Sequence, residues 1–119
     1  MATKSIFILE DDPDISELVV YLLSDAGYQV YQCATVRAFQ QILSERLPDL
    51  FILDILLPDG SGIEICRQLR TDGKTAHIPV LLMSANKTKR ELEEHGCTAD
   101  FISKPFNIDF FKERVNHYI

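Results

Sequence analysis

The sequence has few cysteines and no paired cysteine motif: only Cys33, Cys66 and Cys97 occur among its 119 residues. Without a Cys-x-x-Cys pair there is no sign of a structural zinc site, and a scattered set of odd number indicates no disulfide framework. We therefore expect the cysteines to be small, buried or half-buried side chains that fill space, and not reactive thiols.

Long apolar runs are also absent. No segment approaches the length needed to cross a bilayer. Residues 1–4 lead directly into a short strand-like segment, without the apolar core and small-residue cleavage site of a secretory signal. We expect a cytoplasmic protein that makes no contact with a membrane.

Basic residues are scarce, with 12 Lys and Arg against 18 Asp and Glu and a net charge of −6. Because proteins bind nucleic acids mainly through Lys and Arg contacts with phosphates, this balance argues against direct nucleic-acid binding. The acidic excess leaves carboxylates available to hold a cation.

A regular alternation of apolar runs and helix-period segments is present instead, in a chain whose length fits one domain, residues 1–119. The predicted strands cover residues 5–9, 28–31, 50–53, 78–83 and 99–102, and the predicted helices cover 13–26, 36–45, 63–70, 87–95 and 106–118. Short links between them indicate a parallel sheet with right-handed crossovers, in a single α/β layer sandwich.

Polar residues follow four of the five predicted strands. They are Glu10, Asp11 and Asp12 after the first strand, Asp54 after the third, Ser84 after the fourth and Lys104 close behind the fifth. Open parallel sheets bind ligands beyond the carboxyl ends of their strands. If these four strands are neighbours, the polar groups converge on one pocket, with Asp12 set aside as a helix cap.

This set of residues has the chemistry of phosphoryl transfer. Glu10, Asp11 and Asp54 place negative charges close together, which is unfavourable without a cation, and Mg²⁺ prefers such oxygen ligands. Asp54 can attack a phosphorus atom and form an acyl phosphate. The metal, the Lys104 ammonium and the Ser84 hydroxyl would offset charge on the transferred oxygens. Asp59 and Asp100 are interpreted as surface acids.

In this order and at these strand ends, the motifs resemble the response-regulator receiver domain of two-component signal transduction, over essentially all 119 residues. The resemblance rests on Glu10-Asp11, the segment 54–62 (DILLPDGSG), Ser84-Ala85 and Lys104-Pro105-Phe106. It implies a flavodoxin-like, doubly wound, five-stranded parallel sheet of order 2-1-3-4-5 flanked by five helices. The Lys-Pro peptide of this family is often cis, which extends the expectation to Lys104–Pro105.

The resemblance also implies a role for each matching residue. Asp54 would be the phosphoacceptor, in a Mg²⁺-dependent reaction with a sensor histidine kinase or a phosphotransfer protein as donor. Asp11 would bind the metal directly, Glu10 through water, and the backbone carbonyl of Leu56 would complete the protein ligands together with Asp54.

Further roles carried over from the family concern the response to phosphorylation. Ser84 would bind a phosphoryl oxygen and Lys104 would pair with the phosphate. Ser84 and Phe101 would form the switch that changes the surface read by a downstream protein, whose identity the sequence does not reveal. The only reactions catalysed would be the domain's own phosphorylation and dephosphorylation, and a homodimer is left open.

Three other functions are weighed against this one. A pseudo-receiver that only binds proteins is disfavoured by the intact Asp11, Asp54, Ser84 and Lys104. A haloacid-dehalogenase-like phosphatase would need a second acid where Leu56 stands. A flavodoxin-type electron carrier would need hydroxyls and glycines after the first strand, where acidic residues would repel the flavin phosphate.

The sequence departs from the family pattern at two places. The segment 84–96 is shorter than usual by nearly a helical turn, and 96–104 is about one residue longer, so we expect the usual output surface to differ in shape. Leu56 and Asn86 flank the site and would govern the access of water to a phosphoryl group.

Overall fold

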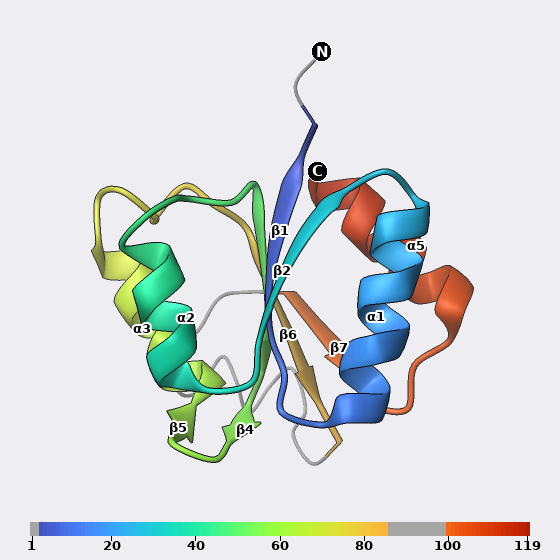
Figure 1. Cartoon of the computed structure of the whole chain (residues 1–119), viewed down its shortest axis with the longest axis horizontal. Helices are drawn as coiled ribbons and strands as arrows, with labels where there is room; N and C mark the ends of the chain where they lie inside the picture. The colour runs from blue at the N-terminus through green and yellow to red at the C-terminus, as the bar shows by residue number, and fades with distance from the viewer. Residues whose placement is uncertain (1–2, 86–99) are drawn as a thin grey trace.

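The computed structural model describes residues 3–85 and 100–119, and its centre is a five-stranded parallel sheet (Figure 1). The strands are β1 (Ser5–Leu9), β2 (Gln29–Cys33), β3 (Leu50–Asp54), β6 (Val80–Ser84) and β7 (Asp100–Ser103). They lie in the order β2-β1-β3-β6-β7, and every neighbouring pair is parallel. The predicted order of 2-1-3-4-5 is therefore confirmed.

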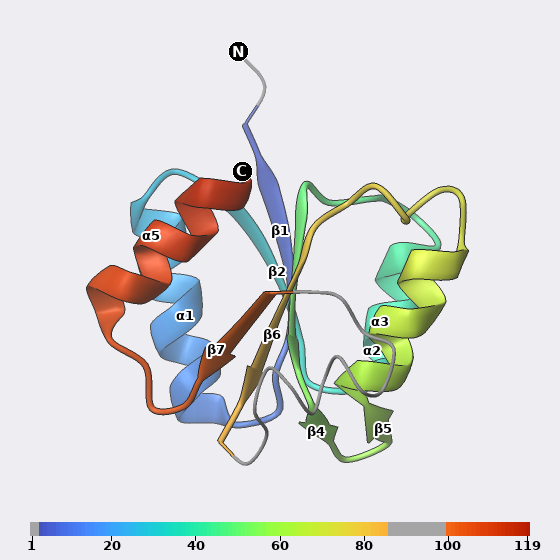
Figure 2. The same cartoon turned by 180° about the vertical axis from the view of Figure 1, so that it is seen from behind.

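Two layers of helices cover the sheet. Helices α1 (Pro13–Asp25) and α5 (Ile108–Tyr118) lie on one face, and α2 (Val36–Leu43) and α3 (Gly62–Thr71) lie on the other, as Figures 1 and 2 show from opposite sides. The helix predicted at 87–95 lies outside the described residues. None of the helices in the described ranges is long and apolar enough to cross a membrane.

The apolar content of the central strands follows from this layering. All five residues of β3 and of β6 are buried, because both faces of these strands are covered. Alternate residues serve opposite layers: Phe7 and Phe51 pack with Phe39 of α2, whereas Ile8 and Ile52 pack on the side of α1 and α5.

Helix α1 begins and ends where the sequence predicts. The Asp12 side chain accepts hydrogen bonds from the backbone N–H groups of Asp14 and Ile15, at 2.9 and 3.3 Å, and Pro13 occupies the first helical turn. Beyond the last turn, Gly27 has a φ of +95°, a conformation that costs glycine little.

The segment after β3, where the sequence predicts only a link to the next helix, has regular structure of its own. It contains a short antiparallel hairpin of strands β4 (Leu56–Leu57) and β5 (Gly60–Ser61). Asp59 lies in the turn of this hairpin and accepts hydrogen bonds from two backbone N–H groups at the start of α2. Asp59 is exposed, as predicted for a surface acid, but its contacts with α2 were not predicted.

Asp100 is likewise more than a surface acid. Its Oδ2 accepts hydrogen bonds from Tyr118, at 2.8 Å, and from two nitrogens of Arg114. Its Oδ1 accepts one from the Phe101 backbone N–H at 2.8 Å. These contacts link β7 to the last turns of α5. Burial alone would raise the pKa of Asp100, but the hydrogen bonds outweigh it and hold the pKa below its usual value.

The expectation for the cysteines is met in part. Cys33 is a free, buried thiol, and burial raises its pKa. Cys66, on α3, is disulfide-bonded, so the expectation of no disulfide is wrong for this residue. Cys97 lies outside the described residues.

Gly62, the first residue of α3, packs against the backbone at the end of β3. A Cβ atom at this position would overlap the Asp54 carbonyl group, and the atoms that it meets are backbone atoms of Asp54 and Ile55 with little freedom to yield. We predict that Gly62→Ala lowers the free energy of unfolding by about 2–3 kcal/mol, as measured by urea denaturation.

Gly73→Ala is the matched control, because a Cβ at Gly73 meets no atom within 4 Å. It should change the free energy of unfolding by less than about 1 kcal/mol. Equal destabilisation by the two variants would contradict the close approach of α3 to β3.

Candidate functional site

The predicted site residues come together at one edge of the sheet, where the strands of the central group end. Glu10 and Asp11 follow β1, Asp54 ends β3 and Ser84 ends β6. Lys104 directly follows β7, and its backbone N–H donates to the Ser84 carbonyl at 2.9 Å. Since β1, β3, β6 and β7 are neighbours in this order, the convergence predicted from the sequence is confirmed.

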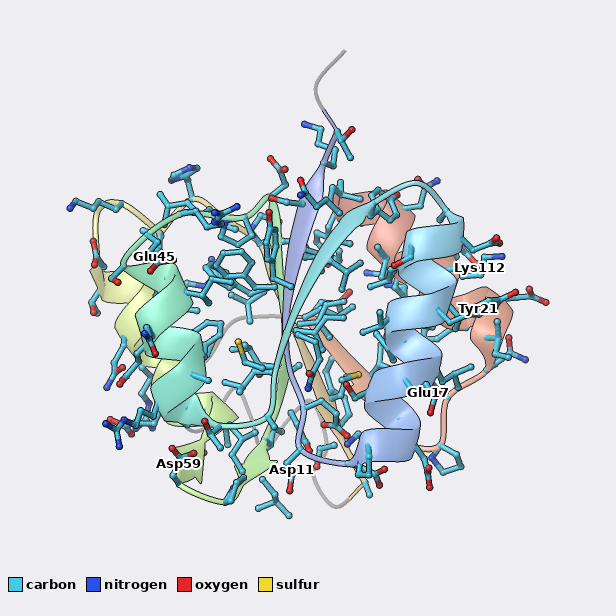
Figure 3. The ribbon with its side chains drawn as sticks, in the orientation of Figure 1. Asp11, Glu17, Tyr21, Glu45, Asp59 and Lys112 are labelled. Atoms are coloured by element: carbon cyan, nitrogen blue, oxygen red, sulfur yellow. The ribbon has the colours of Figure 1, made fainter. Side chains whose placement is uncertain are left out.

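Three carboxylates form the acidic part of the site. Glu10, Asp11 and Asp54 each offer one oxygen, and these oxygens all lie within 4.8 Å of one another. Glu10 is fully buried, Asp54 is 7% exposed and Asp11 is open to solvent, at the position labelled in Figure 3. The group therefore has two buried oxygen donors and one that faces outward.

A lysine ammonium lies between two of these carboxylates. Lys104 Nζ donates a hydrogen bond to Glu10 Oε1 at 2.8 Å and is 3.2 Å from Asp54 Oδ2. Burial opposes the charge on Lys104, but the Glu10 and Asp54 carboxylates outweigh it and raise the pKa of Lys104. The Lys104–Pro105 peptide bond that follows is cis, as expected from the resemblance.

Glu10 is the carboxyl group most disturbed by its surroundings. Burial, and then the neighbouring Asp54 side chain, raise the pKa of Glu10 to about 8, although Lys104 acts in the opposite direction. In addition, Glu10 Oε2 is buried and makes no hydrogen bond within the described part of the chain. Even beside Lys104, this carboxyl group therefore favours its protonated form at neutral pH when no metal ion is bound.

The oxygen donors fit a magnesium ion. Mg²⁺ is held in proteins by one or two carboxylates together with waters and phosphate oxygens. The three clustered carboxylates supply hard oxygen ligands, and the buried, unpartnered Glu10 Oε2 is an acceptor with capacity to spare. The site is thus chemically suited to a small divalent cation.

Leu56 stands at the rim of the site. It follows Asp54 by two residues, and its side chain is 60% exposed. Its backbone is held in place by pairing with Ser61 across the β4–β5 hairpin, while Ser61 itself caps α3 by accepting a hydrogen bond from the Ile63 backbone N–H at 3.2 Å. The backbone of Leu56 is therefore fixed close to the end of β3.

The two residues predicted to form a switch lie on neighbouring strands. Ser84 is buried at the end of β6, and Phe101 is half-buried in β7, where it is paired in register with Leu82 and packs on the side of α2 and α3. Two register positions separate Ser84 from Phe101. Asn86, predicted to flank the site, lies outside the described residues.

A hollow of about 530 Å³ between α2 and α3 contains none of these residues. It lies near the C-terminal ends of both helices, where Arg46 and Lys74 are among its lining residues. This places it at the opposite edge of the sheet, so its size does not make it the centre of the chemistry.

Comparisons with a family model, with curated proteins and with solved structures all indicate the same family. The model of the response regulator receiver domain matches residues 6–116 of the chain. DNA-binding dual master transcriptional regulator RpaA from Synechocystis sp. is 38% identical over 112 residues, which are 92% of this chain and 46% of that protein. The chain thus spans about half the length of this relative.

A second relative has nearly the same length. Polar-differentiation response regulator DivK from Brucella ovis is 33% identical over 120 residues, covering 98% of this chain and 97% of DivK. Among solved structures, the receiver domain of sensor histidine kinase PA1611 from Pseudomonas aeruginosa superposes with a TM-score of 0.85 at 22% identity, with 98% of each chain covered. That crystal structure contains a magnesium ion in its active-site cleft, and at this identity the likeness shows the fold.

The sheet order, the residues that meet at its edge and a family match over 6–116 agree with one another. The chain belongs to the family of response-regulator receiver domains.

Proposed function

We propose that this receiver domain, residues 1–119 acting as one unit, takes a phosphoryl group onto Asp54 in a Mg²⁺-dependent reaction. The observation that carries the proposal is the position of Lys104 Nζ, 2.8 Å from Glu10 and 3.2 Å from Asp54, beside a cluster of three carboxylates. A nucleophile, a fixed cation and a set of metal-binding oxygens meet here, as phosphoryl transfer requires.

Glu10, Asp11, Asp54 and the backbone carbonyl of Leu56 would hold the metal ion. Asp11 and Asp54 would bind it directly, and Glu10 through a water molecule. When bound, the ion would neutralise charge on the oxygens of the transferred group. The magnesium ion in the PA1611 receiver domain supports this assignment by analogy of fold.

The chain's own residues do the rest. A carboxylate oxygen of Asp54 attacks phosphorus, and the bond from phosphorus to the histidine nitrogen of the donor breaks as the aspartyl phosphate forms. Lys104 places its ammonium where negative charge increases, already 3.2 Å from the accepting carboxylate. The buried Ser84, at the end of the adjacent strand, offers a hydroxyl to a phosphoryl oxygen.

The partner that supplies the phosphoryl group would be a sensor histidine kinase or a phosphotransfer protein, in the cytoplasm. The domain catalyses no reaction beyond its own phosphorylation and dephosphorylation. Its output would pass to a downstream protein and not by direct contact with nucleic acid, given a net charge of −6. Ser84 and Phe101 would carry the change from the phosphate to the surface.

The first prediction from the proposed function concerns the phosphoacceptor. Incubation with acetyl phosphate and Mg²⁺ should add the mass of one phosphoryl group, read by intact-protein mass spectrometry. Asp54→Asn should abolish the gain, because an amide is not a nucleophile at this pH. Asp25→Asn, at an exposed position at the end of α1, should leave it unchanged. A gain that survives Asp54→Asn would place the chemistry elsewhere.

The second prediction follows from the pKa of Glu10, about 8 in the metal-free protein. Cation binding favours the ionised carboxyl group, so Mg²⁺ affinity should rise by up to about tenfold per pH unit between pH 6 and 8 and then level off. Calorimetry in two buffers of different ionisation enthalpy should detect the released proton. Glu10→Gln should remove both the release and the slope.

The direction of the pKa shift of Glu10 can also be checked by measuring the stability of the metal-free protein. The folded protein holds the Glu10 proton up to a pKa of about 8, whereas the unfolded chain loses it near the ordinary value of 4.5. The Glu10 contribution to the free energy of unfolding therefore decreases as pH rises from about 4.5 to 8. Wild-type and Glu10→Gln proteins with parallel stability curves in this range would contradict the shift.

The third prediction tests the switch. Beryllofluoride with Mg²⁺ mimics the aspartyl phosphate and should shift the NMR resonances of Ser84 and Phe101. The reason is that a bound ligand can only favour a second arrangement through contacts that differ between the two. A folded, beryllofluoride-loaded protein with unchanged resonances at both residues would exclude this pair as the switch.

A further inference from the structure

Asp59 joins two elements that are distant in the sequence. It lies in the turn of the β4–β5 hairpin, and Figure 3 shows it at the foot of α2. Its Oδ1 accepts a hydrogen bond from the Val36 backbone N–H at 2.8 Å, and its Oδ2 accepts one from the Arg37 backbone N–H at 3.1 Å. Val36 is the first residue of α2, so these donors are groups that lack partners inside the helix.

The charge of Asp59 suits this position. The N-terminal end of a helix carries partial positive charge, which favours a carboxylate. The hydrogen bond from the Val36 backbone holds the pKa of Asp59 below its ordinary value, so the side chain remains an ionised acceptor at neutral pH. The contact is therefore a charge-assisted one on both oxygens.

Asp59 adds to a local cap of α2 and does not replace it, because the two side chains bind different backbone N–H groups. The Thr35 Oγ1 accepts a hydrogen bond from the Ala38 backbone N–H at 3.2 Å. Asp59, in contrast, comes from 23 positions further along the chain than Val36. A cap supplied over this distance fixes the position of the segment that supplies it as well as the helix that receives it.

The hairpin that carries Asp59 also carries Leu56. Leu56 is paired with Ser61 and Leu57 with Gly60, so the turn at Asp59 is three residues from Leu56. The other end of the hairpin is fixed where Gly62 packs against the Asp54 carbonyl. The orientation of the hairpin therefore depends on two contacts: the packing of Gly62 at its base and the hydrogen bonds of Asp59 at its tip.

The tip also has little room to move towards α2. A Cβ atom on Gly60 would lie 2.9 Å from Val36 Cγ2, so the hairpin packs tightly on the first residue of the helix. Asp59 and Gly60 thus engage the same residue of α2, one through its backbone N–H and the other through its side chain.

We propose that Asp59 is a positioning residue of the phosphoacceptor site: by tying the tip of the β4–β5 hairpin to the start of α2, it holds the Leu56 backbone carbonyl beside Asp54. The inference rests on the proposed function, in which that carbonyl binds the metal. Asp59 itself would contact neither the metal nor the phosphate and would act only through the hairpin.

The test compares two variants that each remove one cap from the same helix. Asp59→Ala removes the hairpin anchor, whereas Thr35→Ala removes the local cap and leaves the hairpin contacts in place. We expect Asp59→Ala to raise the Kd for Mg²⁺ about tenfold, as loss of a residue that orients a metal ligand does. Thr35→Ala should change it less than about twofold, both measured by calorimetry.

The rate of phosphorylation by acetyl phosphate should distinguish an effect on the metal-binding geometry from an effect on the reaction at Asp54. In Asp59→Ala the rate should fall at limiting Mg²⁺ and return to the wild-type value at saturating Mg²⁺, because Asp54 and Lys104 are untouched. Asp59→Asn, which keeps one oxygen acceptor, should lie between wild type and Asp59→Ala. Equal effects of the Asp59 and Thr35 variants on the Kd would overturn the proposal.

Hydrogen exchange in the metal-free protein measures directly how firmly Asp59 holds the β4–β5 hairpin. Amides in residues 56–61 should exchange faster in Asp59→Ala than in wild type or Thr35→Ala, and unchanged exchange would also overturn the proposal. A wild-type protein that gains no phosphoryl group would contradict the proposed function, whereas the exchange experiment would still show whether Asp59 holds the hairpin.

Discussion

The contact of the Lys104 ammonium with the Glu10 and Asp54 carboxyl groups is the interaction on which the site depends when no metal is bound. Two buried carboxyl groups, Glu10 and Asp54, end neighbouring strands, and Lys104 Nζ lies within 3.2 Å of both. Burial of like charges is unfavourable unless a cation or a proton compensates. Lys104 supplies part of that compensation. Burial and the neighbouring Asp54 nevertheless raise the pKa of Glu10 to about 8, so a proton on Glu10 supplies the rest.

The sheet makes this concentration of charge possible. Strands β3 and β6 are buried along their whole length between two helical layers, so their apolar residues stabilise the fold while their last residues are free to be polar. Parallel strands end at the same edge, and a chemistry that needs several side chains can therefore take one from each strand. The hairpin after β3 and the close packing of Gly62 complete the rim.

The strands, and the positions of Asp54 and Lys104 at their ends, could be predicted from the sequence, because buried strands and the residues that follow them form a local pattern. The strand order came from the resemblance to the receiver family. It missed the partners of Asp59 and Asp100, since both lie in other elements: Val36 is 23 positions from Asp59, and Arg114 is 14 from Asp100. The raised pKa of Glu10 was equally out of reach. An acidic residue near a strand end can face water or be buried, and only the packing distinguishes the two cases.

Successive side chains of strand β7 pack against different helical layers. Phe101 packs on the side of α2 and α3, whereas Ile102 and Asp100 face α1 and α5, where Asp100 is bound to Arg114 and Tyr118. Successive residues of one strand are thus coupled to different halves of the molecule. A change in the packing of the Phe101 ring would therefore alter contacts with α2 and α3, while the contacts of Asp100 with Arg114 and Tyr118 could stay in place.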